Sequence, residues 1–482
     1  MSINNNETPA PQAPHILIFP YPAQGHTLPL LDFTHQLALR GLTLTILTTP
    51  KNLPTLSHLL QTHPQIKTLT LPFPSHPSLP PGVENVKELG NAGNLPIMAA
   101  LPNLRDPIIH WFRSNTNPPV AIISDFFLGW TQKLAQELNI PRIAFFSSGA
   151  FLVSVLDYCW NHVANDSDVV EFVGLPRTPS FKEEHLPSIF RRYRGGDPVW
   201  ENIKDAMVAN IMSWGCIFNT FEDLESEYLE YLKKLTGHDR VYGVGPISLL
   251  GPSKRELSSK ADSNKELLGW LDGCPDGSVL YVCFGSQKLL SKNQMQALAT
   301  GLERSGTRFI WVVNTGSAQL IEEGIGVGVP DGFEERVAGR GMVVRGWAPQ
   351  VLLLSHNSVG GFLSHCGWNS VLEGLVGGVV ILGWPMEADQ YVNARLLVED
   401  MGIAVRVCEG AGSVPDPDEL ASAIAESLSE DVKVKVRAKE MRDKALTAVK
   451  FGGSSWRDLD MLVKELSQLQ MRGKHRDRET RL

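Results

Sequence analysis

The stretch from Trp347 to Gln390 places residue types in the order that a ligand site would need. At its centre, SHCGWNS follows an apolar run and precedes VLEGL, which predicts a strand, a tight turn and a helix start. The unpaired N–H groups and positive dipole end of such a helix favour a phosphate above Asn369 and Ser370. Trp347 adds an aromatic platform, and Asp389 with Gln390 adds hydroxyl-binding side chains. The stretch therefore predicts a nucleotide-sugar site.

Two residues far from this stretch, His26 and Asp125, are candidates for acid–base chemistry. His26 follows a predicted apolar strand at 15–21 and Asp125 ends another at 120–126, so both should reach the carboxyl edge of a sheet. There a neutral imidazole could act as general base toward an alcohol or phenol, and a carboxylate that contacts it would fix its tautomer. The alternatives are a solvated histidine at a helix start and an aspartate that caps the next segment.

Other familiar catalytic motifs are missing from the sequence. It has no GxSxG elbow, no GxxxxGK[ST] loop and no dinucleotide-binding glycine spacing. His365 and Cys366 are adjacent and would point to different faces of a strand-like segment, so we interpret Cys366 as a packing residue. Asp458 and Asp460 fall in WRDLDMLVKEL, a predicted amphipathic helix, and so indicate an exposed face rather than a metal-binding pair.

Composition bounds the class of protein. The 482 residues suffice for two domains, and 43% hydrophobic with 20% charged residues are typical of a globular chain. The net charge of −8 argues against nucleic acid or an anionic membrane as the main partner. We expect no transmembrane segment, because no long window is free of polar residues, and no signal peptide, because the N-terminus is polar. Six cysteines without a pairing pattern indicate reduced thiols and a cytoplasmic setting.

Short apolar runs alternate with helical patterns in both halves of the chain, which predicts parallel sheets with right-handed crossovers. In the first half we expect strands at 15–21, 43–49, 66–72, 120–126 and 142–148, and helices at 28–41 and 130–140. In the second half we expect strands at 278–286, 309–314, 342–347, 359–364, 379–384 and 402–407. The pattern weakens from 161 to 240. Two doubly wound α/β domains follow, with an interdomain cleft between facing sheet edges.

Taken together, these motifs resemble the plant family of UDP-dependent glycosyltransferases that act on secondary metabolites. The 347–390 stretch is similar to that family's signature box, and the likeness extends over nearly the whole chain through FPYPAQGH, ISDFF, VGPI, VLYVCFGS, FIWVV, PDGFEERV and GGSSWRDLD. LPFPSHPSLPPGVENV and SDFFLGW look most like the flavonol and hydroxybenzoate glucosyltransferases of the family. The resemblance implies a GT-B fold, in which two Rossmann-like, doubly wound parallel-sheet domains face an interdomain cleft.

The resemblance and the linker-like composition of 244–264 together suggest a division of the chain. We expect a disordered tail at 1–14, an acceptor-binding domain at 15–243, a linker at 244–264 and a UDP-sugar-binding domain at 265–455. We expect a helix and charged tail at 456–482 to pack back on the N-terminal domain.

The resemblance also implies a role for each matching residue. Trp347 should stack on uracil, the Ala348 backbone should pair with its edge, and the ribose hydroxyls should be held by Gln350 and Glu373. The diphosphate should be contacted by His365, Asn369, Ser370 and Ser286. The sugar should be contacted by Trp368, Asp389 and Gln390, and from the other domain by Ser147. His26 matches the family's catalytic base, and Asp125 matches its partner.

The implied activity is inverting transfer of glucose from UDP-glucose to a hydroxyl or carboxyl of a small phenolic acceptor, such as a flavonoid or hydroxybenzoate, to give a β-glycoside. Gln390 favours glucose, because glutamine at this position goes with glucose in the family; UDP-xylose, UDP-rhamnose and a terpenoid acceptor stay open. We expect an aromatic acceptor pocket from Phe145 and, above all, from Tyr21, Phe126, Phe127 and Phe146.

We expect a monomer with no permanently bound cofactor and no metal. A metal-dependent GT-A transferase would need a DxD at a strand end, which the sequence does not offer. A UDP-sugar-binding protein without chemistry is the non-enzymatic alternative, which intact His26 and Asp125 argue against. Three positions depart from the residue that is usual in the family: Gly377 stands in place of alanine, Val380 in place of proline and Asn314 in place of arginine.

Overall fold

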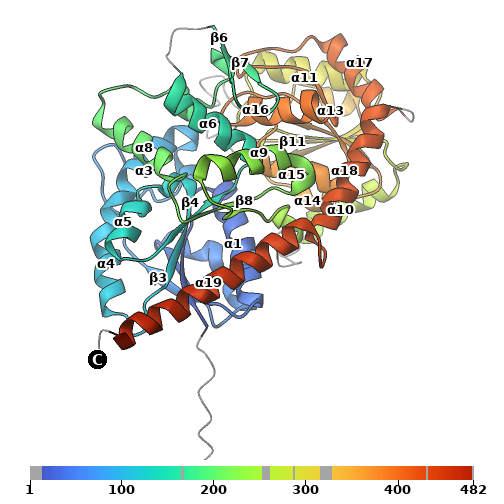
Figure 1. The fold of residues 1–482 in the computed structure, drawn as a ribbon. Coiled ribbons are helices and arrows are strands. Elements are labelled where there is room, and N and C mark those ends of the chain that lie inside the picture. The colour runs from blue at the N-terminus through green and yellow to red at the C-terminus, as the bar shows by residue number, and fades with distance from the viewer. Residues whose placement is uncertain are drawn as a thin grey trace, which may run out of the picture.

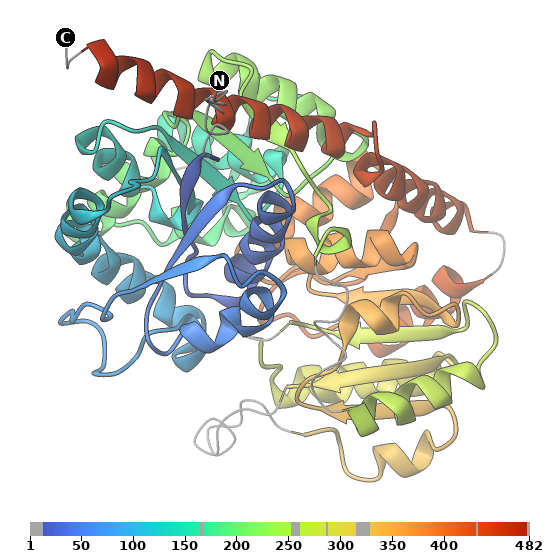
Figure 2. The same cartoon turned by 90° about the horizontal axis from the view of Figure 1, so that it is seen from below.

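The computed structural model describes residues 13–163, 168–251, 261–285, 288–314, 328–429 and 432–479. Its strands form two large parallel sheets, each flanked by helices, and the two resulting α/β domains lie side by side (Figures 1 and 2). The predicted tail at 1–14 lies outside the described residues except for its last two positions, and so do residues 252–260 of the predicted linker. Within the described ranges, no helix combines the length and apolar character that crossing a membrane requires.

The N-terminal sheet has seven parallel strands in the order β3-β2-β1-β4-β5-β8-β9. The strands are β1 (His15–Phe19), β2 (Thr43–Thr48), β3 (Lys67–Thr70), β4 (Ala121–Asp125), β5 (Arg142–Phe146), β8 (Gly215–Phe218) and β9 (Val241–Gly243). Successive residues of β1 enter two different buried clusters, Leu17 and Phe19 on one face and Ile16 and Ile18 on the other. Both faces of the sheet are therefore buried, as parallel sheets require.

Helices cover this sheet, and a two-stranded antiparallel hairpin lies apart from it (Figure 1). The helices are α1 (Gln24–Leu39), α2 (Ser57–Thr62), α3 (Asn94–Ala100), α4 (Arg105–Ser114), α5 (Thr131–Glu137), α6 (Ala150–His162), α7 (Ser188–Arg191), α8 (Pro198–Ala209) and α9 (Glu222–Thr236). The hairpin consists of β6 (Val169–Glu171) and β7 (Ser180–Lys182). α8 begins at a clear helix start signal, because Asp197 accepts hydrogen bonds from the first-turn backbone N–H groups and Pro198 follows it.

The C-terminal sheet has six parallel strands in the order β12-β11-β10-β13-β14-β15. The strands are β10 (Val279–Cys283), β11 (Arg308–Val313), β12 (Gly341–Arg345), β13 (Val359–Ser364), β14 (Val380–Gly383) and β15 (Ala404–Arg406). The helices of this half are α10 (Ala261–Asp272), α11 (Lys292–Arg304), α13 (Phe333–Arg336), α14 (Gln350–Leu354), α15 (Trp368–Gly377), α16 (Gln390–Arg395), α17 (Pro417–Leu428) and α18 (Lys433–Val449). Both sheets thus have the doubly wound topology that the alternating pattern predicts.

The last helix, α19 (Ser454–Glu479), crosses from the C-terminal half to the N-terminal sheet (Figure 2). Its Leu459, Leu462 and Leu466 belong to the same buried cluster as β1 and β2. Asp458 accepts a hydrogen bond from the backbone N–H of Gly243 at 2.7 Å, which joins the helix to the end of β9. The helix is amphipathic as expected, but Asp458 is hydrogen-bonded to Gly243 instead of lying on an exposed face.

All of the expected strands are present, and each end lies within three residues of the expected position. Two strands of the N-terminal sheet, β8 and β9, fall in or beside the region where the sequence pattern weakens. Both are short and buried on both sides, so they lack the alternation that identifies a strand in a sequence. The domain limits at 15–243 and 265–455 remain a division inferred from the sequence.

Candidate active site

The site lies where the carboxyl edges of the two sheets face each other. In each sheet the chain winds outward in opposite directions from one pair of neighbouring strands, β1 with β4 and β10 with β13. Such a switch point leaves a crevice beyond the strand ends. Two hydrogen bonds join the edges: Asn369 Nδ2 donates to the carbonyl of Gly25 at 2.8 Å, and Trp368 Nε1 donates to that of Asn219 at 2.7 Å. Residues of both domains therefore meet at this point.

His26 and Asp125 contact each other at the N-terminal switch point. The Nδ1 atom of His26 lies 2.9 Å from Oδ2 and 3.1 Å from Oδ1 of Asp125. The carboxylate is fully buried, whereas the histidine side chain is 19% exposed. Because a carboxylate only accepts, Nδ1 carries the proton in this pair and Nε2 keeps its lone pair. The imidazole is thus fixed in the tautomer that a general base needs, with its basic nitrogen directed away from Asp125.

The position of His26 corrects the expected helix boundary. Helix α1 begins at Gln24 rather than at residue 28, so His26 lies in its first turn, and its backbone N–H donates to the carbonyl of Ala23 at 3.0 Å. The proline and apolar residues that follow had indicated a later start. Pro29 is the sixth residue of this helix and has no N–H to donate to the carbonyl of Gly25, which instead accepts from Asn369 Nδ2.

Asp125 fulfils both roles that its sequence position allowed. Besides contacting His26, its Oδ1 accepts the backbone N–H of Phe127 at 2.9 Å and so caps the short 3-10 helix that follows β4. Arg142 Nη2 donates to the Asp125 carbonyl at 3.4 Å. Burial lowers the pKa of Arg142 to about 10, so its guanidinium still carries a positive charge at neutral pH.

Aromatic side chains surround the imidazole of His26. The rings of Tyr21, Phe126 and Phe127 lie with their centroids 5.2, 5.3 and 4.5 Å from that of His26. Phe126 also stacks on Phe146 at 5.4 Å. The four residues assigned to the acceptor pocket are therefore close together. Phe145 is not among them, because it points to the opposite face of the sheet and contacts Phe33.

The residues assigned to the ribose contact one another on α14 and α15. Gln350 Nε2 donates to Glu373 Oε2 at 2.6 Å and to Ser370 Oγ at 3.0 Å, while Tyr281 Oη donates to Gln350 Oε1 at 3.4 Å. Glu373 falls in the second turn of α15, from which its carboxylate reaches back to Gln350. These polar groups hold one another in place without a ligand.

The indole of Trp347 lies just before this cluster in sequence and is 41% exposed, whereas Ala348 is buried. A large aromatic ring exposed to this extent is free to stack on a flat base. The arrangement fits the stacking and edge-pairing roles that the resemblance implies for these two residues.

The turn between β13 and α15 places His365 at the helix start. Gly367 is the N-cap of α15, and Cys366 adopts a left-handed conformation with φ of 64° rather than a strand-like one. A Cβ added to Gly285 or to Gly367 would lie 2.9 or 2.6 Å from Nε2 of His365, so both positions need glycine. Cys366 itself is buried, which confirms its interpretation as a packing residue.

His365 is a neutral side chain with an unused hydrogen-bonding atom. Burial lowers its pKa to about 4, so the imidazole is uncharged at neutral pH. Its Nδ1 is buried and has no hydrogen-bond partner among the described residues. An unpaired polar atom beside a helix N-terminus is suited to an anionic ligand.

Asp389, near the end of the signature stretch, lies close enough to His26 for their charges to interact. Asp389 accepts hydrogen bonds from Asn393 Nδ2 at 2.7 Å and from the backbone of Trp368. Burial raises the pKa of Asp389, and the nearby His26 partly offsets this effect. The carboxylate of the C-terminal domain and the imidazole of the N-terminal domain are therefore electrostatic neighbours.

Gln390 has an amide whose orientation is fixed by its own loop. Its Oε1 accepts the backbone N–H groups of Met386 and Glu387 at 2.9 and 3.0 Å. Both lone pairs of the carbonyl oxygen are thus engaged, and the amide NH₂ is the group that could donate to a ligand hydroxyl.

The remaining assigned residues are placed as follows. Ser147 is buried directly after β5, on the N-terminal side of the site. Trp368 is buried, and its indole N–H donates to the carbonyl of Asn219. Ser286 lies outside the described residues. Asn314, which stands where arginine is usual in the family, donates to the carbonyl of Gly285 at 3.3 Å. Gly285 in turn lies beside His365.

A second departure, Gly377, also has a structural reason. A Cβ at this position would lie 2.5 Å from the carbonyl oxygen of Leu354, so the alanine that is usual in the family would force the backbone to move. Val380 is buried in β14 and packs in the core of the C-terminal domain.

Sequence reasoning missed the residues that support the site. Arg142 is buried at the start of β5, and no motif marks it. Asn393 follows Asp389 by four residues at the start of a helix, a spacing that brings two side chains together and could have identified it. Over the part of the chain that the structure describes, no group of three or more His, Cys, Asp or Glu side chains could hold a metal ion.

Comparison with known proteins covers both halves of the chain. Residues 15–249 match the model of a glycosyltransferase N-terminal domain, and residues 258–436 match that of UDP-glucoronosyl and UDP-glucosyl transferases. UDP-glycosyltransferase 89A2 of Arabidopsis thaliana is 56% identical over 95% of this chain and 96% of its own length. Flavonol 3-O-glucosyltransferase UGT89B1 of the same plant is 48% identical over 96% of this chain and 98% of its own length.

The structural neighbours include UGT89C1 of Arabidopsis thaliana, solved in complex with UDP-L-rhamnose and in complex with quercetin. The UDP-L-rhamnose complex is 39% identical in sequence and superposes with a TM-score of 0.79, over 94% of this chain and 99% of the other. The fold and the sequence similarity thus agree over 94% or more of the chain.

Proposed function

This chain belongs to the plant family of UDP-dependent glycosyltransferases with a GT-B fold, and from that membership we propose that it transfers glucose from UDP-glucose to a hydroxyl of a small phenolic acceptor. The observation that carries the proposal is the His26–Asp125 pair, which lies among aromatic rings and beside Asp389 of the donor-binding half. Acceptor oxygen, base and sugar would then meet within one crevice. A carboxyl acceptor, which would give a glucose ester, uses the same geometry.

In the proposed reaction, His26 Nε2 accepts the proton of the acceptor hydroxyl while the acceptor oxygen attacks the anomeric carbon. The bond between that carbon and the UDP oxygen breaks on the opposite face, so an α-linked donor gives a β-glycoside. Asp125 stabilises the imidazolium that forms. The base and its partner both come from the N-terminal domain.

Negative charge that develops on the departing UDP would be held by the N-terminus of α15 together with Asn369, Ser370 and the neutral His365. Asn369 now donates to the carbonyl of Gly25, and would exchange this bond for one to the diphosphate. Gln350 and Glu373 would bind the ribose, and Trp347 would stack on uracil. The amide NH₂ of Gln390, with Asp389, Trp368 and Ser147, would contact the sugar.

Two donors are supported by different observations. Gln390 and the similarity to a flavonol 3-O-glucosyltransferase favour UDP-glucose. The structural neighbour solved with UDP-L-rhamnose makes UDP-rhamnose the second candidate. We further propose that the enzyme acts as a monomer, without a metal, in the cytoplasm, where its six unpaired cysteines would stay reduced.

The proposal is tested by supplying UDP-glucose or UDP-rhamnose with a flavonol, a hydroxybenzoate and a triterpenoid. The products are identified by mass spectrometry and proton NMR. We expect a flavonol glucoside, with the coupling constant of its anomeric proton indicating the β configuration, and the same rate with EDTA. Transfer that requires a divalent cation, or UDP binding without transfer to any acceptor, would refute the proposed reaction.

A further inference from the structure

A short segment of the N-terminal domain, residues 182–192, packs against the loop of the C-terminal domain that carries Asp389 and Gln390. The segment runs from the end of β7 through a 3-10 helix, Glu183–His185, into α7. The loop, residues 386–391, follows β14 and enters the first turn of α16. The two residues proposed to contact the donor sugar beside Trp368 therefore lie in a loop that the other domain touches.

The first contact between the segment and the 386–391 loop is a stack of two rings. The imidazole of His185 and the phenol ring of Tyr391 lie with their centroids 4.2 Å apart and their planes inclined by 10°. The Tyr391 side chain is buried, and its Oη donates to the carbonyl of Met386 at 3.1 Å. Tyr391 thus ties the two ends of the loop together, and His185 packs on the ring that does so.

The stack is one between two uncharged rings. Burial lowers the pKa of His185 below its ordinary value of 6.5, an effect that Glu409 and Glu184 oppose and that Lys182 and Arg406 reinforce. The imidazole is therefore neutral at pH 7 and contacts its partner as an aromatic ring. A phenylalanine ring in its place could make the same contact.

The second contact is a hydrogen bond between the two backbones. The N–H of Ser188, the first residue of α7, donates to the carbonyl of Ala388 at 3.3 Å. Ala388 has a φ of 58°, a left-handed conformation that is uncommon for a residue with a Cβ. Because Ala388 precedes Asp389 directly, this conformation sets the direction in which the Asp389 side chain leaves the loop. The N-terminal domain thus holds the loop at its strained residue.

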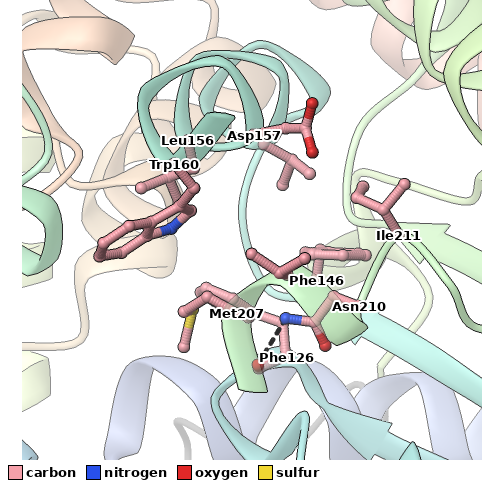
Figure 3. Close-up of a pocket in the computed structure, with 10 residues that line it drawn as sticks. Phe126, Phe146, Leu156, Asp157, Trp160, Met207, Asn210 and Ile211 are labelled. Atoms are coloured by element: carbon pink, nitrogen blue, oxygen red, sulfur yellow. Dashed lines mark hydrogen bonds between the residues drawn. The ribbon is translucent and has the colours of Figure 1, made fainter. Parts of the chain in front are cut away.

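The far side of α7 is anchored to the half of the site that holds the proposed base. The ring of Phe190 makes a T-shaped contact with the indole of Trp160, with 5.1 Å between the ring centroids. Trp160 lines a small cavity together with Phe126, as Figure 3 shows, and Phe126 stacks on His26. One short helix therefore links the surroundings of His26 to the 386–391 loop.

We propose that His185 is a positioning residue for the donor sugar: by stacking on Tyr391, it holds the 386–391 loop in the conformation in which Asp389 and Gln390 meet the sugar hydroxyls. The inference rests on the proposed glycosyl transfer, in which Asp389 and Gln390 contact the sugar. It assigns part of donor recognition to the N-terminal domain, through a residue that acts on the loop and not on the sugar itself.

The test measures the affinities of UDP-glucose and of UDP by calorimetry without an acceptor. A displaced loop should weaken binding of the sugar but not of the nucleotide, because uracil, ribose and diphosphate are assigned to other residues. We expect His185→Ala to leave the Kd of UDP unchanged and to raise the ratio of the UDP-glucose Kd to the UDP Kd roughly three- to tenfold, the effect of losing one aromatic pair. His185→Phe restores a stacking ring and should return the ratio to the wild-type value.

His162→Ala is the matched control. It removes the same side chain from the same domain and also breaks a ring contact, that of His162 with Tyr158 at 4.8 Å, but this contact lies on α6 and does not involve the 386–391 loop. The control should keep the wild-type ratio. An unchanged ratio in H185A, an equal rise in H162A, or no recovery in H185F would overturn the proposal.

Ser188→Pro is a second variant, which leaves both rings of the stack in place. Proline is tolerated at the first position of a helix, and Pro187, with φ of −52° and ψ of 129°, already has the conformation that a following proline needs. The substitution removes the N–H that donates to Ala388, so the ratio should rise in the same direction as in H185A, by about two- to fivefold. A wild-type ratio in S188P would refute the role of this contact in holding the loop.

The positioning role and the proposed function can fail separately. If the wild type transfers sugar to no phenol, but the ratio rises in H185A and S188P and recovers in H185F, glycosyl transfer is refuted and the positioning role stands. If the wild type forms a glucoside, but all variants share its ratio, the positioning role is refuted and the proposed function stands.

Discussion

The two halves of the site differ in the contacts that hold their side chains. In the half proposed to bind the donor, Gln350, Glu373 and Ser370 are hydrogen-bonded to one another, and Gln390 is fixed by its own loop. In the half proposed to bind the acceptor, the rings of Tyr21, Phe126 and Phe127 pack around the imidazole of His26. Hydrogen bonds are directional, whereas ring contacts tolerate more than one arrangement. The difference predicts a narrower choice of donor than of acceptor.

The variant His26→Ala is the strongest test of whether the base belongs to the acceptor half and acts separately from donor binding. If the base belongs to the acceptor half, kcat/KM for glycosyl transfer should fall by about 10³-fold or more, because general-base assistance is lost. UDP affinity, measured by calorimetry, should be unchanged, because the donor half contains no part of His26. Turnover close to that of the wild type would remove His26 from the mechanism.

Asp125→Asn should have the next largest effect. The amide can still accept the backbone N–H of Phe127, but it cannot stabilise the imidazolium as a carboxylate does. We expect a loss of about 10² in kcat, at the low end of acid–base contributions. Pre-steady-state measurement of the chemical step gives the value. A loss below about threefold would mean that Asp125 acts only as a cap.

Trp347→Ala probes the donor half alone. Removing the exposed indole should weaken UDP binding roughly tenfold, since stacking on one base contributes about 1–3 kcal/mol. At saturating UDP-glucose, kcat should stay near the wild-type value, and Trp347→Phe should recover most of the affinity. A fall in kcat with unchanged donor KM would contradict the separation of the two halves.

The smallest effect concerns Asp458, which lies on α19 and contacts the N-terminal sheet. Burial raises its pKa to about 6 from an ordinary 3.8, so the folded protein binds its proton more tightly than the unfolded chain. Stability from this group is therefore present below pH 4 and is lost as the pH rises through about 6.

Asp458→Asn removes this titration but keeps an acceptor for Gly243. The melting temperature of D458N relative to the wild type should rise by roughly a few degrees between pH 4 and pH 7. Thermal unfolding followed by circular dichroism at four pH values measures this difference, and an offset that is constant across the range would contradict it. UDP affinity should not change.

The sequence could reveal one half of the site better than the other, because the two halves differ in how many separate segments contribute to them. The donor half is largely one continuous stretch, so the order of Trp347, Gln350 and Glu373 could be recognised along the chain. The acceptor half is built from separate segments, which contribute Tyr21 with His26, Asp125 with Phe126, and Phe146. No local pattern in the sequence shows that these segments meet, and only the folded structure brings them together.

The fold was more predictable than the orientation of its side chains. Alternating strands and helices indicated both doubly wound sheets, since this pattern is a local property of the sequence. That Gln390 turns its carbonyl toward its own loop, or that Phe145 points away from the pocket while Phe146 lines it, depends on tertiary contacts. Such contacts produce no periodic pattern in the sequence.

Helix α19 has a consequence for the order in which the protein can be completed during synthesis. The N-terminal sheet leaves the ribosome first, yet Leu459, Leu462 and Leu466 of its core follow the whole C-terminal sheet in the chain. Until they emerge, one face of the N-terminal sheet lacks part of its cover. The half of the enzyme that holds the proposed base therefore reaches its final packing only after the C-terminal half has been translated.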